Sequence, residues 1–212
     1  MRNIISILVG WMFIMTAGAQ DMKTVFINMP DSIMPLLTKV NREDCVDFLA
    51  SDMKAVVRNR FGENSEMKEM TDDYLCMQVT DVSSLQMKLL PLNDSVKVIC
   101  MVKTVCAVAC DSEIRFFDTR WKELSSKDYV QLPAKDFFYQ QTDLDDDERV
   151  EILNKADLYL KKISLSNENT ELLVEYTTPL YLNKDDRGKL QKELKEDPVI
   201  LEWVNGCFQI KA

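Results

Sequence analysis

The chain has 212 residues, 35 of them acidic and 26 basic, and it contains no histidine. Its net charge of −9 repels phosphate backbones and anionic lipid, so nucleic acid and membrane surfaces are not expected partners. The lack of histidine excludes Ser-His-Asp and Cys-His catalysis and any His-containing zinc site, which removes most common enzyme classes.

Residues 1–19 have the pattern of a secretory signal peptide. Arg2 gives a positive end, residues 4–15 are mostly apolar, and Ala17-Gly-Ala offers a cleavage site before Gln20. The apolar run is shorter than the roughly 20 residues that a membrane span needs. We therefore expect a soluble periplasmic or secreted protein, cleaved near Ala19-Gln20 and without a membrane span. An uncleaved anchor is the alternative. Because cleavage removes one cation, Arg2, the net charge would fall from −9 to −10.

The region that follows predicts short elements. We expect a short strand at 25–27, a compact helical segment over 31–37, and a second helix whose N-cap is Asn41. Residues 55–61 and 74–79 alternate between apolar and polar side chains, which is typical of strands.

The stretch 85–121 is the centre of the predicted fold, because a single period of alternating apolar and polar residues explains nearly all of it. It predicts three antiparallel strands, 85–91, 96–110 and 113–118, with the second turn at 111–112. Both faces of the middle strand carry apolar side chains, so this strand should be buried. One face is expected to carry Leu85, Met87, Leu89, Ile99, Met101, Val105, Ala107, Ala109, Ile114 and Phe116.

After Trp121 the pattern predicts an irregular connector followed by alternating helices and hairpins. The expected elements are a helix opened by a capping box at 145–148, strands 159–165 and 172–178, a helix from 185 or 186, and strands 199–204 and 207–210. Asn205-Gly206 predicts a type I′ turn in the last hairpin, because both central positions of that turn need positive φ.

These elements predict an α+β fold with an antiparallel meander sheet and helices packed mainly on one face. Residues 35–56 are weakly similar to 179–201, which favours two related helix-plus-sheet halves, 20–128 and 129–212. Chance explains the similarity about as well. One continuous domain is therefore the alternative.

Six cysteines are present, but their spacing does not resemble a disulfide framework. Cys100, Cys106 and Cys110 share one parity of the predicted strand 96–110, where residues i and i+4 lie about 13 Å apart, too far for a bridge. We therefore predict that most cysteines are small buried hydrophobes. Thiolate metal binding by Cys106 and Cys110 would need a helix, which the β-type pattern disfavours.

Three aspartates, Asp143, Asp145 and Asp147, occupy the first, third and fifth positions of a calcium loop. Glu148 stands where such a loop needs glycine, and Asn154 where it needs a bidentate glutamate. A capping box with extra acidic residues at a helix start explains the cluster more simply. Ca²⁺ is the one cofactor candidate.

Three further features of the sequence bear on function: its many carboxylates, a Ser-Lys segment and a set of aromatic residues. A paired-carboxylate hydrolase is compatible with 35 acidic residues, although their number alone is no evidence. Ser125-Ser-Lys has no spacing that brings an amine to a hydroxyl, so a solvated loop is expected there. Aromatic residues are candidate anchors for a partner, with core positions as the alternative: Trp121, Phe137, Phe138, Tyr139 and Trp203.

Several short motifs resemble one family along nearly the whole mature chain. They are Phe26-Ile-Asn-Met-Pro-Asp-Ser, Pro35-Leu-Leu-Thr, Asn59-Arg-Phe-Gly, Thr71-Asp-Asp-Tyr, Met87-Lys-Leu-Leu-Pro, Thr178-Pro, Glu202-Trp, Asn205-Gly and Phe208. The sequence thus resembles the uncharacterised exported family of Bacteroidales called domain of unknown function 3256. The resemblance implies export in a Gram-negative bacterium. It implies no activity and offers no catalytic residues.

Together these observations predict an exported, non-enzymatic binding module of the cell envelope, whose partner is an unidentified protein or envelope component. No catalytic residue is assigned. The alternatives are a carboxylate-based hydrolase acting on envelope or dietary polysaccharide and a calcium-stabilised module.

Overall fold

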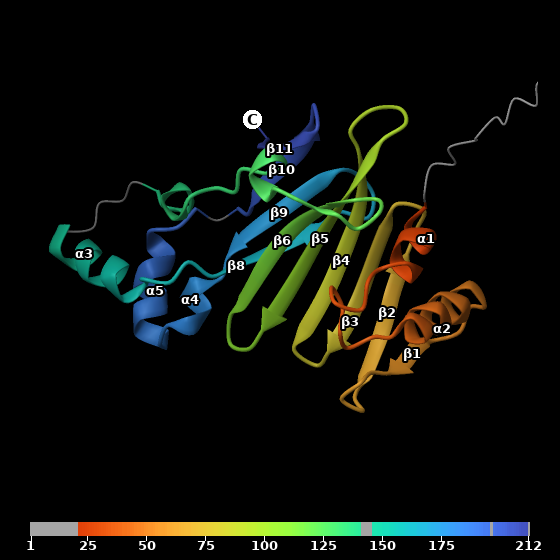
Figure 1. Ribbon diagram of the computed structural model, residues 1–212. Helices are drawn as coiled ribbons and strands as arrows, with labels where there is room; N and C mark the ends of the chain where they lie inside the picture. Colours follow the sequence, from red (N-terminus) through yellow and green to blue (C-terminus); the bar gives the residue numbers. More distant parts are fainter. Residues whose placement is uncertain (1–20, 141–145, 196, 212) are drawn as a thin grey trace, which may run out of the picture.

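The computed structural model describes residues 21–140, 146–195 and 197–211. Within these ranges the chain forms two antiparallel sheets and five α-helices (Figure 1). The α+β class and the antiparallel meander sheet are therefore confirmed.

The larger sheet has seven strands in sequence order, each paired with the next. They are β1 Ala55–Arg58, β2 Asn64–Met70, β3 Tyr74–Thr80, β4 Ser83–Pro91, β5 Lys97–Cys106, β6 Cys110–Asp118 and β7 Glu123–Leu124. The smaller sheet has the order β11-β10-β9-β8. Its strands are β8 Lys161–Leu165, β9 Glu171–Tyr176, β10 Val199–Val204 and β11 Cys207–Ile210. The division of the chain at 128/129 stays a prediction.

Two helices, α1 Met22–Ile27 and α2 Lys39–Ala50, cover one face of the larger sheet at its β1–β3 side (Figure 1). The strand predicted at 25–27 is wrong, because the Asp21 side chain accepts a hydrogen bond from the Thr24 N–H and starts α1 instead. Thr38 and Asn41 form a reciprocal capping box at the start of α2, so the N-cap is Thr38 rather than Asn41.

The segment 30–37 between these helices forms turns rather than the predicted helix. It is fixed by Arg42, a fully buried residue of α2. The Arg42 guanidinium donates to the carbonyl oxygens of Met29 at 2.5 Å and Leu37 at 2.7 Å, and to Asp31 at 3.1 Å. Backbone oxygens that no helix satisfies are thus bound by one side chain.

The other face of the larger sheet packs against the smaller sheet and a second hydrophobic core. Strand β8 lies at the edge of the smaller sheet and crosses β6, β5 and β4. Its outward N–H groups are satisfied by side chains of the larger sheet: Ile163 N–H donates to Ser112 Oγ and Leu165 N–H to Gln86 Oε1, both at 2.9 Å. This edge is therefore closed to further strand pairing.

The turn between β5 and β6 lies at 107–109, not at the predicted 111–112. This shift exchanges the two faces of β6, so each of its side chains lies on the side of the sheet opposite to the one predicted. Phe116 therefore lies in the core under the smaller sheet, whereas Met87 and Met101 lie in the core under α1 and α2. The prediction that all three share one face is wrong.

The same shift overturns the prediction for Cys106 and Cys110. They do not lie on one strand but face each other across the hairpin, with Cα atoms 4.0 Å apart, and form a disulfide. Of the six cysteines, Cys45 and Cys100 are buried free thiols, whereas Cys76 and Cys207 are partly exposed, so the prediction that most are small buried hydrophobes is wrong. Burial raises the pKa of the Cys45 thiol to about 11 and that of Cys100 well above its ordinary value.

The remaining helices extend the second core beyond the β6 side of the larger sheet (Figure 1). They are α3 Asp146–Lys155, α4 Thr178–Tyr181 and α5 Lys184–Lys192. The final hairpin matches its predicted bounds, and Asn205 and Gly206 have φ of 53° and 81°, as the type I′ turn requires. Strand β2 was not predicted, because its sequence is mostly polar.

Candidate functional site

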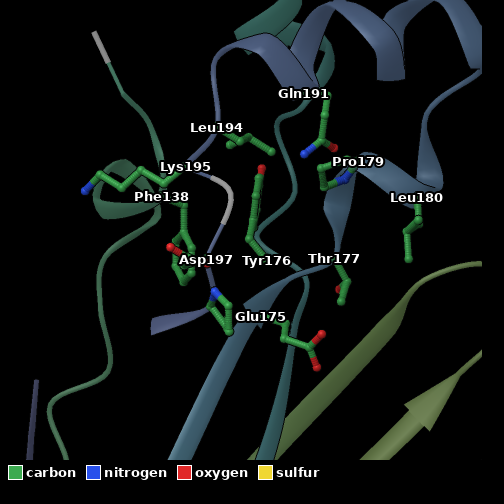
Figure 2. Close-up of a pocket in the computed structure, with 11 residues that line it drawn as sticks. Phe138, Glu175, Tyr176, Thr177, Pro179, Leu180, Gln191, Leu194, Lys195 and Asp197 are labelled. Carbon is green, nitrogen blue, oxygen red and sulfur yellow. The ribbon is translucent and has the colours of Figure 1, made fainter. Parts of the chain in front are cut away.

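A hollow of about 230 Å³ lies at the end of β9, between α4, α5 and the residues that follow α5 (Figure 2). We call it the Tyr176 pocket, because the ring of Tyr176 stands in its middle. Its lining comes from three regions that are far apart in sequence: Phe138, residues 175–180, and residues 191–195 together with 197–198.

Tyr176 is held in place by two aromatic neighbours. Its ring stacks on the buried ring of Phe138 at 5.6 Å, and its hydroxyl lies 3.2 Å from that of Tyr139. Phe138 is itself fixed beside the end of α5, since Lys195 N–H donates to its carbonyl oxygen at 2.9 Å. The pocket therefore has a rigid aromatic centre.

The apolar walls come from α4 and α5. Pro179, at the start of α4, and Leu180 form one side, and Leu194 forms another. Arg187 of α5 donates to the carbonyl oxygens of Pro179 at 3.0 Å and Leu180 at 2.6 Å, which fixes α4 against α5. Two charge-assisted hydrogen bonds thus hold the α4 side of the wall.

The rim carries polar groups of both signs. Glu175 pairs with Lys162 at 3.0 Å, and Lys195 Nζ donates to the Phe137 carbonyl oxygen at 2.6 Å. Asp197 is exposed, and no described cation lies within 4 Å of its carboxylate. Asp197 is therefore the rim group that can accept hydrogen bonds or a positive charge from a ligand.

Tyr139 and Tyr159, whose rings contact that of Tyr176, are unsuited to proton transfer near neutral pH. Burial raises the pKa of Tyr159 to about 12, and burial together with the Tyr176 hydroxyl raises that of Tyr139 further. Among the described residues no group of three or more Cys, Asp or Glu side chains could hold a metal ion. The arrangement can bind a flat apolar group, and it assembles no recognisable catalytic set.

The predicted calcium ligands are not brought to this pocket. Asp143 and Asp145 lie outside the described residues, and Asp147 is exposed in the first turn of α3. The helix expected after the capping box is present as α3. The calcium site itself stays a prediction.

The predicted aromatic anchors differ in position. Trp121 is buried and donates its indole N–H to the Val25 carbonyl oxygen at 3.0 Å, so it is a core residue. Phe138 is also buried, but it supports the Tyr176 pocket. Phe137 is 39 % exposed and carries the Lys195 ammonium over its ring at 4.3 Å. Tyr139 is half-buried.

Trp203 and the Ser125-Ser-Lys segment lie away from the Tyr176 pocket. Trp203 lies beside the stacked rings of Phe116 and Tyr129, with its ring centroid 6.3 Å from each, as aromatic residues at the edge of a core do. Ser126 is in a short 3-10 turn on the surface and donates to the Ile114 carbonyl oxygen at 3.3 Å. Sequence reasoning missed Tyr176 as a site residue, because its strand pattern alone gives no sign of the helices that meet it.

Comparisons with known proteins give a family and a solved relative. The family model described as "Protein of unknown function (DUF3256)" matches residues 14–208. The chain is also similar to a solved structure described as a domain of an uncharacterized protein from Porphyromonas gingivalis W83, with 26% identity and a TM-score of 0.78. That match covers 88% of this chain and 97% of the other. Among curated proteins, none matches.

Proposed function

Since the chain belongs to the DUF3256 family of proteins of unknown function, we propose a role from its own geometry: it is a non-enzymatic binding module whose Tyr176 pocket receives a flat apolar side chain of a protein partner. The family resemblance seen in the sequence is confirmed by this membership.

The shape of the pocket carries the proposal. At about 230 Å³ it is smaller than the roughly 300–1,000 Å³ of pockets that bind drug-sized ligands, and it suits a single side chain. Its centre is an aromatic ring with apolar walls at Pro179 and Leu194. Aromatic side chains in such pockets are common anchors of protein interfaces.

Charge indicates the kind of partner. Asp197 lies at the rim, and the chain has a net charge of −9. A segment with Lys or Arg next to its apolar anchor would meet a complementary surface, which favours association and orientation.

We further propose that this partner is encountered outside the cytoplasm. Two observations support export: the signal-like pattern of residues 1–19 and the Cys106–Cys110 disulfide, a bond that persists mainly in oxidising compartments. In the described part of the chain, no helix has the length and apolar character needed to cross a membrane. An envelope or secreted protein is the partner class that fits.

The hydrolase alternative is less well supported. Such an enzyme needs two carboxylates available to one substrate, and at this pocket Glu175 is already held by Lys162. The calcium-stabilised module is tested separately: added calcium should raise the melting temperature of the protein, and Asp145→Asn should abolish the rise.

The test is site-specific photocrosslinking in the native envelope. A benzophenone amino acid replaces Leu180, 42 % exposed beside the pocket, and in a control chain replaces Val40, 61 % exposed on α2. We expect a discrete adduct from position 180 and none from position 40. Adding Tyr176→Ala should abolish the adduct, whereas Tyr176→Phe, which keeps the ring, should retain it. An adduct that persists in the correctly folded Tyr176→Ala chain would refute the pocket as the binding site.

A further inference from the structure

A second hollow, of about 200 Å³, lies on the helix side of the larger sheet. It is formed where the turns of 33–36 approach the ends of β3, β4 and β5. We call it the Lys103 groove, and its principal lining residues are Met34, Leu36, Val79, Leu85, Lys103 and Val105. The Tyr176 pocket belongs to the smaller sheet and its helices, so the two sites are separate.

The groove is mostly apolar, and Lys103 is the charged residue in its lining, which also includes the hydroxyl residues Ser83, Ser84 and Thr104. Met34 and Leu85 are buried in its floor, while Val105, 57 % exposed, lies at its mouth. Lys103 projects from β5 on the same face as Leu85, its partner in register on β4. The Lys103 ammonium therefore lies among hydrophobic side chains, in a groove that is open to water on one side.

The ammonium of Lys103 is incompletely compensated. It donates to the Ile33 carbonyl oxygen at 2.7 Å, but an ammonium has three donors. Glu113 faces Lys103 in register on β6, yet no carboxylate of the described residues lies within 4 Å of the amine. Burial and the charge of Arg115, which Glu113 partly offsets, lower the pKa of Lys103.

Arg115, the other cation near this amine, is already paired with a carboxylate. Its guanidinium is engaged by Glu123, through Nε at 2.8 Å and Nη2 at 2.7 Å. The groove thus offers a half-buried positive charge with spare donors, beside an apolar surface. This combination of groups is complementary to an anion with an apolar tail.

We propose that the Lys103 groove binds a small amphipathic carboxylate, with the carboxylate on the Lys103 ammonium and a short aliphatic tail over Met34, Leu36 and Val79. The volume fits such a tail, because an apolar cavity of about 150 Å³ holds benzene and this groove has about 200 Å³. A free aliphatic acid of roughly six to eight carbons is the ligand class that we assign. This inference is independent of the proposed partner-binding function.

The test uses octanoate as the probe, with the ¹⁵N-labelled protein and NMR chemical shifts of backbone amides. We expect saturable shifts confined to the residues that line the groove, 33–36, 79, 83–85 and 103–105. Octanol, which lacks the charge, and acetate, which lacks the tail, should each bind at least about tenfold more weakly. Shifts that do not saturate, or that spread over the whole surface, would refute a built site.

Two variants test the role of the charge. Lys103→Gln should weaken octanoate binding at least about tenfold and leave octanol unchanged, while the control Lys161→Gln on β8 should bind octanoate normally. If Lys103→Gln fails to fold, Val105→Glu at the exposed mouth gives the same test, because its carboxylate should repel octanoate but not octanol. Unchanged octanoate affinity in a folded variant of either kind would overturn the proposal.

A last comparison tests the source of the carboxylate. Acetyl-Gly-Leu carries an apolar side chain beside a free C-terminal carboxylate, and its amide lacks that charge. Tighter binding of the dipeptide acid than of octanoate would show that the groove takes a peptide C-terminus, and the assignment to a free aliphatic acid would then be wrong.

Discussion

Arg42 fixes the turns that precede α2, and replacing it by methionine should destabilise the protein strongly. In Arg42→Met the carbonyl oxygens of Met29 and Leu37, which accept from the guanidinium at 2.5 and 2.7 Å, lose their donor in a buried setting. Each unsatisfied buried group costs about 1–3 kcal/mol. Because methionine is uncharged, the variant avoids the free-energy cost of burying a guanidinium, and this offsets part of the loss. We expect a decrease of about 3 kcal/mol in the free energy of unfolding.

The ion pair with Asp31 should contribute little to that loss. Asp31 is 44% exposed and has a second partner, Arg60, at 2.9 Å, so removing Arg42 does not leave its carboxylate unpaired. Asp31→Asn is therefore the matched control, and it should cost less than about 1 kcal/mol.

Urea unfolding measures both variants, with the fluorescence of the buried Trp121 as the probe. The midpoint should fall for Arg42→Met while the slope of the free energy with urea stays the same. A loss below about 1 kcal/mol for Arg42→Met, or an equal loss for Asp31→Asn, would show that the backbone contacts of Arg42 do not carry the stability.

Three further predictions concern the disulfide, the half-buried Tyr159 and the last hairpin. Alkylation of the unfolded, unreduced protein should label four of its six cysteines, and labelling of all six would contradict the disulfide. The double variant Cys106→Ser, Cys110→Ser should lose about 2 kcal/mol of unfolding free energy in urea, which is the loop-entropy value for a five-residue ring. Because the pKa of Tyr159 is raised to about 12 in the folded state, stability present below the ordinary pKa of 10 should be lost as pH rises from 10 to 12, and melting temperatures should fall less over that range in Tyr159→Phe. A parallel fall in both proteins would assign the effect to other groups. Gly206→Ala should cost about 1 kcal/mol in thermal unfolding, because φ is 81° and the added Cβ would lie 3.2 Å from Leu92 Cδ2; an unchanged melting temperature would refute this.

The sequence predicts the elements whose signals are local. Asn205-Gly206 sets the last hairpin because its turn type depends on two residues alone. The turn between β5 and β6 could not be placed, because Ala107-Val-Ala carries no glycine, proline or asparagine and continues the apolar pattern of the strand. An error of a few residues there moved Phe116 to the wrong face and hid the disulfide.

Tertiary contacts explain the other failures. Strand β2 is mostly polar, and it becomes a strand through pairing with β1 and β3. The Tyr176 pocket was beyond sequence reasoning because its lining comes from three separate regions of the chain, and no spacing links Phe138 to Leu194. The prediction of aromatic anchors reached Phe138 on residue type alone and could not tell it from Trp121, which is a core residue.

Because side chains of the larger sheet cover the edge of β8, completion of the smaller sheet depends on the larger one. Ser112 and Gln86 can saturate the backbone donors of Ile163 and Leu165 only after β4 and β6 are aligned, so the smaller sheet is complete only on a preformed template. A fragment beginning near residue 129 would carry these donors uncovered and would recruit strands from its own copies. The N-terminal sheet thereby shields the edge of the C-terminal one.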